Sequence, residues 1–421
     1  MEKMLSITWV LISLLWLDEV SAKPTVLQMT QKLNRKVNGL EKAVANIEKM
    51  LEVISSQVSE LIEDKDQLTD LLANISPGSG DQPDIDKDDS GLDRPTKRLV
   101  LRDDFNSLNL DNWDYEVSMY GGYNWEIQVY TRDVKNIFTT DGSLFIKPTL
   151  TADSYGEQYL HTGTMNVTEM WGTCTNAADY GCVRHGQNGL LPPVMSGKLM
   201  SKKTVTFGEV CVRARIPQGD WIWPAIWMLP RSNYYGEWPR SGEIDLMESR
   251  GNSEAKDTDG NDHGRNEIGS TLHWGPDAGQ NKFYLTHGER DDGTFSTEMH
   301  TYCVDWTEDN ITISVDGNQV MATGGNFWQK GGFSGSNIWS SGGNMAPFDQ
   351  PFYLILNVAI AGKNGFFPDN WTYNSPKPWN NTSPTVPADF WSARDKWHPS
   401  WQGDNVAMEI DYVEMYEYVY N

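Results

Sequence analysis

Apolar side chains follow two different patterns along the chain. Over residues 26–72 they recur at alternating spacings of four and three, and the seam is interrupted only at Thr30 and Lys65. Such a heptad pattern is typical of a coiled coil, in which the apolar seams of neighbouring helices pack together. It therefore predicts a coiled coil over residues 26–75 and, through it, a homo-oligomer of two or three chains. The alternative is a single amphipathic helix that lies on the rest of the protein.

Over residues 98–421 the pattern is that of β-structure. Short runs of alternating apolar and polar residues are separated by Gly, Asn, Asp and Pro; the clearest runs are residues 144–146, 210–216, 311–315, 352–359 and 408–418. Asp141-Gly142 and Asp316-Gly317 are dipeptides typical of tight hairpin turns. Many short strands without long helices between them predict an all-β domain, a two-sheet antiparallel sandwich.

The N-terminus has the features of a secretory signal peptide. Lys3 gives a basic start, residues 5–17 are apolar, and Val20-Ser21-Ala22 fits a small-residue cleavage site. The apolar run is too short to cross a bilayer, and no later segment is longer and equally apolar. We therefore expect a signal peptide over residues 1–22, a secreted, extracellular protein and no membrane span.

A polar segment separates the two patterned regions. Pro77-Gly78-Ser79-Gly80 is followed by a run rich in Asp, a composition that is too polar to form a core. We expect a flexible acidic linker over residues 76–97. The whole chain of 421 residues carries a formal net charge of -24, which disfavours nucleic acid and anionic membranes as partners.

Four cysteines, all in the β-region, suit the disulfides of a secreted protein. We expect Cys174 to pair with Cys182 in a small loop, and Cys211 to pair with Cys303 between strands. Zinc binding is the weaker alternative, because no C-x-x-C is present. Glycosylation sequons occur at Asn74, Asn166, Asn310, Asn370, Asn380 and Asn381.

The segment Ser241–Ser249 carries the most distinctive chemistry. Side chains alternate between the faces of a strand, so Glu243 and Asp245 share one face, and a one-residue β-bulge would return Glu248 to it. Carboxylates this close raise one another's pKa, which leaves a protonated acid beside an ionised one, as glycoside cleavage requires. A solvated acidic edge strand is the alternative. It is disfavoured by four nearby Trp residues, Trp221, Trp223, Trp227 and Trp238, because aromatic faces suit sugar rings.

Two segments, Trp223–Pro230 and Trp238–Asn252, resemble glycoside hydrolase family 16. Within that family the chain is most similar to invertebrate β-1,3-glucanases (laminarinases) and to β-1,3-glucan-binding recognition proteins. The resemblance extends from about Leu99 to the C-terminus. It implies a β-jelly-roll sandwich with a concave sugar-binding cleft.

The resemblance also implies a retaining mechanism that needs no cofactor. Glu243 would be the nucleophile, Glu248 the acid and base, and Asp245 would tune a neighbour's pKa. The implied substrate contacts are Trp223, Trp238, His273, Asn124 and Glu126. The family often holds a structural calcium ion, for which Asp411 would be a ligand.

Two classes of function follow. The first is a secreted endo-β-1,3-glucanase of digestion or of innate immune recognition of microbial glucan. The second is a non-catalytic lectin, multimerised by the coiled coil, that binds β-1,3-glucan and lipopolysaccharide. The presence of both Glu243 and Glu248 favours the enzyme. A purely structural matrix protein would leave the carboxylate row unexplained.

Overall fold

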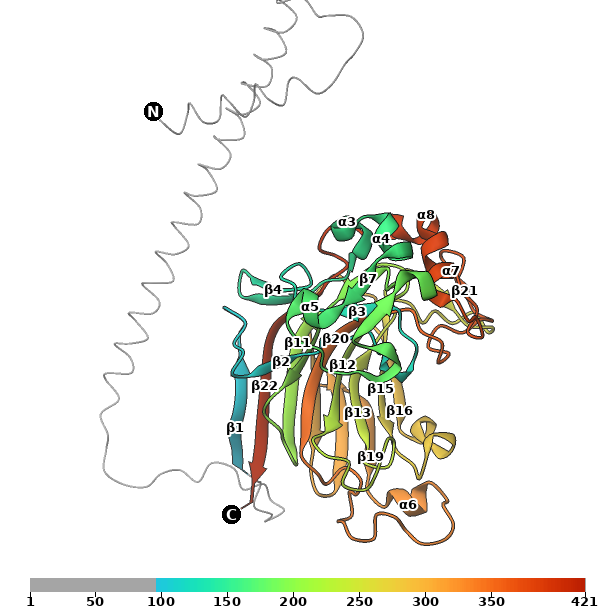
Figure 1. The fold of residues 1–421 in the computed structure, drawn as a ribbon. Coiled ribbons are helices and arrows are strands. Elements are labelled where there is room, and N and C mark those ends of the chain that lie inside the picture. The colour runs from blue at the N-terminus through green and yellow to red at the C-terminus, as the bar shows by residue number, and fades with distance from the viewer. Residues whose placement is uncertain (1–95, 421) are drawn as a thin grey trace, which may run out of the picture. The chain divides into compact units, whose positions relative to one another are not determined.

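The computed structural model describes residues 96–420 (Figure 1). The predicted signal peptide, coiled coil and Asn74 lie outside the described residues, as does the linker up to residue 95. Strand β1 (Thr96–Asp103) begins two residues before the expected start of the β-domain. Within residues 96–420, no helix combines the length and the apolar character needed to cross a membrane.

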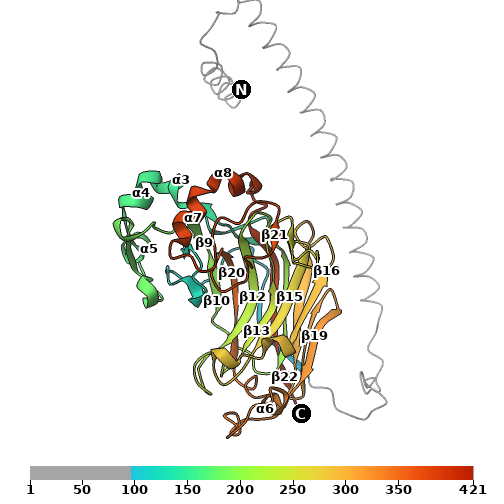
Figure 2. The same cartoon turned by 90° about the vertical axis from the view of Figure 1, so that its right-hand side faces the viewer.

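Two antiparallel sheets form the body of the domain (Figures 1 and 2). The eight-stranded sheet has the order β19 (Asn318–Gly324), β18 (Asn310–Val315), β17 (His300–Trp306), β11 (Gly208–Arg215), β22 (Met408–Val419), β5 (Ser143–Ile146) and β4 (Ile137–Thr140), with β1 also paired to β22. The seven-stranded sheet has the order β16 (His287–Asp291), β15 (Glu267–His273), β13 (Glu243–Glu248), β12 (Ile222–Pro230), β20 (Phe352–Ile360), β10 (Lys198–Ser201) and β2 (Trp113–Tyr115). These sheets confirm the predicted all-β sandwich.

The core lies between the sheets because each strand turns its apolar side chains to that side. In β11, Val210, Val212 and Ala214 are buried at every second position, and in β13 Ile244 and Leu246 are fully buried. The side chains at the alternate positions form the two outer faces of the sandwich. The face of the seven-stranded sheet that points away from the core is therefore free to carry a site.

Turns and disulfides agree with the sequence. Asp141-Gly142 joins β4 to β5, and Asp316-Gly317 joins β18 to β19, with positive φ at all four residues, as a type I′ turn requires. Cys211 on β11 lies opposite Cys303 on β17, and the two are bonded. Cys174 is bonded to Cys182. Both expected pairings are therefore present.

The remaining elements are short. A small sheet has the order β3 (Gln128–Tyr130), β9 (Val194–Ser196) and β6 (Thr149–Leu150). Between β6 and β9 the chain forms five short elements, which are α3 (Thr151–Tyr155), α4 (Glu157–Thr162), β7 (Thr164–Asn166), α5 (Val167–Trp171) and β8 (Val183–His185). Further along the chain lie β14 (Ala255–Lys256), α6 (Phe327–Lys330), β21 (Thr372–Tyr373), α7 (Val386–Ser392) and α8 (Arg394–Trp397). No helix within residues 96–420 exceeds seven residues, as the absence of long helical periodicity predicted.

The described sequons differ in exposure. Asn310, Asn370 and Asn380 are exposed and stay candidates for glycosylation. Asn166 is half-buried and caps α5 with its side-chain oxygen. The side chain of Asn381 is also half-buried, and its amide donates to the carbonyl of Phe367, so a glycan there would have to displace that contact.

Candidate active site

Strand β13 contains the predicted bulge. Asp245 pairs with Thr271 of β15, whereas Glu248 pairs with Gly269, so three steps along β13 match two steps along β15. The extra residue lets Leu246 and Met247 both point into the core. Glu248 thereby returns to the face that carries Glu243 and Asp245, and the three carboxylates form one row.

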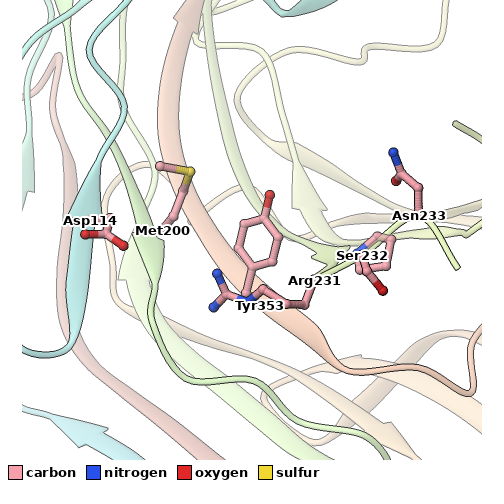
Figure 3. Close-up of a pocket in the computed structure, with 7 residues that line it drawn as sticks. Asp114, Met200, Arg231, Ser232, Asn233 and Tyr353 are labelled. Atoms are coloured by element: carbon pink, nitrogen blue, oxygen red, sulfur yellow. The ribbon is translucent and has the colours of Figure 1, made fainter. Parts of the chain in front are cut away.

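This row lies in a narrow cleft on the outer face of the seven-stranded sheet. The cleft is also lined by side chains from β10, β12, β20, β3 and the segment before β3, namely Tyr120, Asn124, Glu126, Tyr130, Lys198, Trp223, Ala225, Trp227, Asn357 and Ala359. A larger pocket of ≈ 340 Å³ borders β2, β10, β12 and β20 (Figure 3). Among the described residues that line this larger pocket, Asp114 is the only one with a carboxylate. A reaction that needs two carboxyl groups can therefore take place in the narrow cleft and not in the larger pocket.

Each glutamate of the row accepts a hydrogen bond from an indole. Trp238 Nε1 donates to Glu243 Oε2 over 2.9 Å, and Trp223 Nε1 donates to Glu248 Oε1 over 2.9 Å. Trp238 is 45% exposed, so its ring is accessible to a ligand. Trp223 is only 6% exposed and is stacked on Phe366, with ring centroids 4.0 Å apart. The structure thus brings both predicted Trp residues to the cleft, in two different environments.

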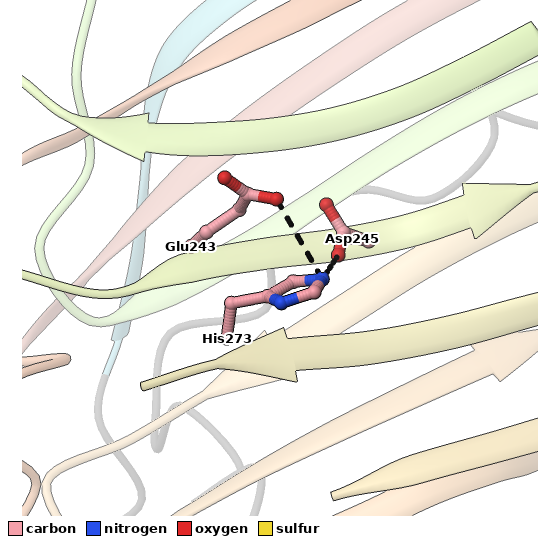
Figure 4. Close-up of side chains that lie close together, drawn as sticks. All are labelled: Glu243, Asp245 and His273. Atoms are coloured by element: carbon pink, nitrogen blue, oxygen red, sulfur yellow. Dashed lines mark ion pairs between the residues drawn. The ribbon is translucent and has the colours of Figure 1, made fainter. Parts of the chain in front are cut away.

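His273 lies beside the first two carboxylates (Figure 4). Its Nε2 is 3.2 Å from Asp245 Oδ2 and 3.8 Å from Glu243 Oε1. The His273–Asp245 contact is short enough for an ion pair, but its angles are not those of a hydrogen bond. Asp245 Oδ2 accepts no hydrogen bond from the described residues. The other ring nitrogen, Nδ1, is 2.7 Å from the amide of Asn281, which orients the ring.

All three carboxyl groups hold protons more tightly than free Asp and Glu. Burial raises the pKa of Glu243 to about 8; the charge of Asp245 adds to this, and His273 opposes it. Burial also raises the pKa of Asp245 well above its usual range, with Glu248 as the second cause. The pKa of Glu248 is raised by burial and held down by His273 and by the Trp223 N–H. The row therefore keeps protonated carboxyls near neutral pH.

Comparison with known proteins identifies this arrangement. Residues 162–337 match the family described as glycosyl hydrolases family 16. A β-1,3-glucan-binding protein of Penaeus monodon is 44% identical over 337 residues, which are 76% of this chain and 90% of the relative. The chain belongs to glycosyl hydrolases family 16.

Two further comparisons within family 16 are informative. A glucan endo-1,3-β-glucosidase of Cryptopygus antarcticus is 33% identical over 63% of this chain and 80% of the relative. The solved laminarinase of Rhodothermus marinus superposes with a TM-score of 0.50 at 24% identity, over 77% of this chain and 99% of that chain, which shows the shared jelly-roll fold. The chain spans 64% of the length of its longer insect relatives.

Asn124 and Glu126 form one wall of the family 16 cleft. The Glu126 carboxylate accepts hydrogen bonds from Asn124 Nδ2 (3.2 Å), Gln128 Nε2 (2.8 Å) and Tyr130 Oη (3.2 Å). Gly122, in the left-handed region at φ 61°, lies so close that a Cβ there would be 2.2 Å from Glu126 Oε1. These two predicted contacts are therefore held in place by their neighbours.

Several residues of the cleft were absent from the predicted substrate contacts, among them Trp227, Lys198 and Asn357. Trp227 Nε1 donates to Asn357 Oδ1 over 2.6 Å. The ammonium of Lys198 lies 5.1 Å from the Trp227 ring centre and 5.7 Å from that of Tyr130, and the residue is 6% exposed. Alternation from Trp223 was compatible with the cleft for Trp227 and equally with the core, whereas a strand lysine gives no sign that it is buried among rings.

Two groups of described side chains have the spacing of metal ligands, Glu243–Asp245–His273 and His263–Glu267–Glu289. A metal at the first group would occupy the carboxylates of the row. Asp411 faces the guanidinium of Arg213, 3.2 Å away. Asp411 belongs to neither of the two groups, and the calcium ion expected there stays a prediction.

Proposed function

We propose that this protein is a secreted, glucan-binding endo-β-1,3-glucanase that cleaves its substrate with retention of configuration. The observation that carries the proposal is the bulged row of Glu243, Asp245 and Glu248. Both glutamates face one cleft, and each is oriented by an indole N–H. Retaining glycosidases use two such carboxyl groups on opposite sides of the scissile bond.

In the first step, the Glu243 carboxylate attacks the anomeric carbon. The Glu248 carboxyl gives its proton to the glycosidic oxygen, the bond to the leaving sugar breaks, and a glycosyl ester forms on Glu243. In the second step, Glu248 takes a proton from water, the water oxygen attacks the anomeric carbon, and the ester bond breaks. Glu243 is regenerated as a carboxylate and Glu248 as an acid.

Asp245 and His273 would control where the protons reside. While Asp245 is ionised, its charge raises the pKa of Glu243; His273 lowers it. Protonation of Asp245 would therefore favour the ionised, nucleophilic form of Glu243. The middle carboxyl thus couples the nucleophile to the acid, and its burial in the strand keeps that coupling strong.

The substrate class follows from the cleft and from the relatives. The accessible Trp238 ring offers a stacking surface for a sugar, and the Penaeus and Cryptopygus relatives are named for β-1,3-glucan binding and for endo-1,3-β-glucosidase activity. We infer a role in innate immune recognition of microbial β-1,3-glucan. The predicted coiled coil would place several clefts on one particle and raise its avidity for a repeating polymer.

The competing function is a lectin without hydrolysis. Glucan binding alone would not require two partly buried glutamates beside the buried Asp245, because charge is expensive to bury. The carboxylate row therefore favours the enzyme over the lectin, and nothing in the described residues points specifically to lipopolysaccharide.

Reducing-sugar release from laminarin, a soluble β-1,3-glucan, tests the proposal. The purified full chain should cleave laminarin, and Glu243→Gln should abolish cleavage but keep binding to insoluble β-1,3-glucan. If neither protein cleaves and both bind, the cleft is a lectin site. If the parent protein neither cleaves nor binds β-1,3-glucan, the assigned substrate is wrong.

A further inference from the structure

A series of stacked planar groups leads away from the acid of the row. Trp223 is parallel to Phe366, with an interplanar angle of 6° and ring centroids 4.0 Å apart. The guanidinium of Arg250 lies 4.2 Å from the Phe366 centroid and 4.7 Å from that of Trp371. Trp371 in turn stacks on His263 at 4.6 Å. We call these five side chains the stack.

The stack has a single order because each planar group has only two faces. Trp223 and Arg250 cannot both lie about 4 Å above the same face of Phe366 without overlapping, so they occupy opposite faces. The same reasoning places Arg250 and His263 on opposite faces of Trp371. Arg250 is therefore the central layer, between two aromatic rings.

Arg250 is held by neutral groups. Its Nε donates to the carbonyl of Phe366 over 2.8 Å, and its Nη1 donates to the carbonyl of His263 over 3.2 Å. Among residues 96–420, no carboxylate oxygen lies within 4.0 Å of its nitrogens. A guanidinium is suited to this place because it is planar, stacks on rings and donates in a fixed geometry, whereas a Lys ammonium does not.

The far end of the stack is fixed to the seven-stranded sheet. His263 Nδ1 lies 2.7 Å from Glu267 Oε1, and His263 Nε2 lies 3.3 Å from Asp257 Oδ2. Glu267 is the first residue of β15, the strand that pairs with β13. The near end is Trp223 of β12, whose Nε1 donates to Glu248. The stack thus spans from one neighbour of β13 to the other, across the end where Glu248 lies.

We propose that Arg250 is a positioning residue for the acid and base: as the central layer of the stack it fixes the plane of Trp223, and through the Trp223 N–H it fixes the carboxyl of Glu248. The proposal rests on the proposed function and assigns a task to a residue that does not touch the substrate. Arg250 also acts directly on Glu248, because its positive charge lowers the pKa of that carboxyl.

Two variants separate the plane from the charge. Arg250→Lys keeps the charge and loses the planar layer, whereas Arg250→Met loses both. Both should lower kcat on laminarin about 10- to 100-fold and leave KM within about twofold, because orientation of the acid matters in the transition state. Both variants should also move the alkaline limb of the pH profile upward, because a displaced Trp223 N–H no longer lowers the pKa of Glu248, and Arg250→Met should move it further because the positive charge is lost as well.

The leaving group distinguishes positioning from general damage. A dinitrophenyl β-laminaribioside releases an anion that needs no proton, so the glycosylation step of both variants should stay within about twofold of the parent. Arg394→Met is the matched control, because Arg394 also stacks on an indole, that of Trp391 at 4.2 Å, but lies on α8. It should leave every rate unchanged.

Equal losses on both substrates would overturn the proposal, as would normal kcat on laminarin in both Arg250 variants. If the parent itself fails to cleave laminarin, the proposed function falls. A ¹³C NMR titration of Glu248, assigned with Glu248→Gln, then decides the Arg250 proposal separately. A pKa of Glu248 that is the same in the parent and in Arg250→Lys, which keeps the charge, would overturn it, and an upward shift in Arg250→Lys would support it because the Trp223 N–H lowers that pKa.

Discussion

The two sheets of the sandwich carry charge in opposite ways. On the eight-stranded sheet, basic and acidic side chains of nearby strands meet in partly exposed pairs, which are Lys97–Glu209, Arg98–Glu417, Arg102–Glu414, Arg213–Asp411 and Arg215–Glu409. On the seven-stranded sheet, three acids share one face, and among residues 96–420 no Lys or Arg nitrogen lies within 4.0 Å of their carboxylates. Both sheets are antiparallel, but they place their charged side chains differently.

This difference shows where the protein accepts an energetic penalty. An exposed ion pair contributes about 0–1 kcal/mol to the free energy of unfolding, so the charges of the eight-stranded sheet change the stability of the protein only slightly. Burying a carboxylate without a cation costs stability and raises its pKa, as it does for Glu243 and Glu248. Such a penalty on one face alone is typical of a catalytic site.

The largest expected effect separates an acid of the row from an acid of the other sheet. Glu248→Gln should lower kcat on laminarin about 10²- to 10⁴-fold, because the leaving oxygen loses its proton donor. Glu417→Gln removes an acid that pairs with Arg98 on the eight-stranded sheet and should leave kcat unchanged. Initial rates at saturating laminarin check both. Equal rates for the two variants would contradict a special role for the row.

A smaller loss should follow removal of one indole N–H. Trp238→Phe removes the hydrogen bond to Glu243, and a bond to a charged group is worth about 1.5–3 kcal/mol, so kcat/KM should fall roughly 10- to 150-fold. The pKa of Glu243 should also rise, since that bond lowers it. Trp391→Phe removes an indole bond to Glu157, away from the cleft, and should leave kcat/KM unchanged. A Trp238→Phe enzyme with unchanged kcat/KM would show that the bond is dispensable.

Asp245→Asn should shift the pH profile more than it changes the maximal rate. The charge of Asp245 raises the pKa of Glu243, so its removal lowers that pKa, and the nucleophile becomes ionised at lower pH. The acidic limb of kcat/KM should therefore move toward lower pH. Rates measured from pH 4 to pH 9 in buffers of constant ionic strength show the limb. An acidic limb that stays in place or moves upward would contradict this coupling.

The smallest effect is expected on the eight-stranded sheet. Arg98→Gln breaks the ion pair with Glu417, and the free energy of unfolding should fall by less than about 1 kcal/mol. The difference should shrink further in 0.5 M salt because exposed charges are screened. Urea denaturation at two salt concentrations measures it. A loss above about 2 kcal/mol would show that the two sheets use charge in a more similar way than we infer.

Local sequence patterns predicted much of this fold. Alternation marked the strands, Asp-Gly marked two hairpins, and the spacing of Glu248 from Glu243 and Asp245 indicated the bulge, since strict alternation would place Glu248 on the other face. The short helices α3–α5 were not predicted. Helices of five or six residues make fewer than two turns and leave no periodic pattern.

Only the part of the candidate site that lies within one short segment of the sequence could be predicted from the residues themselves. The three carboxylates and Trp238 lie within one segment, and a family resemblance supplied the rest of the expected residues. The stack could not be predicted, because Phe366 and Trp371 come from a loop more than 100 positions after Trp223. Contacts of that kind depend on how the loops fold back over the sheet.

The most direct test of the retaining mechanism is to trap the covalent intermediate. The full chain with Glu248→Gln is incubated with an activated 2-fluoro β-laminaribioside, digested and analysed by mass spectrometry. We expect the mass of one fluorinated laminaribiosyl group on the peptide that contains Glu243, and none when Glu243 is also replaced by Gln. Turnover of the activated substrate by the parent with inversion at the anomeric carbon, or a label on another residue, would contradict the assignment of Glu243 as the nucleophile.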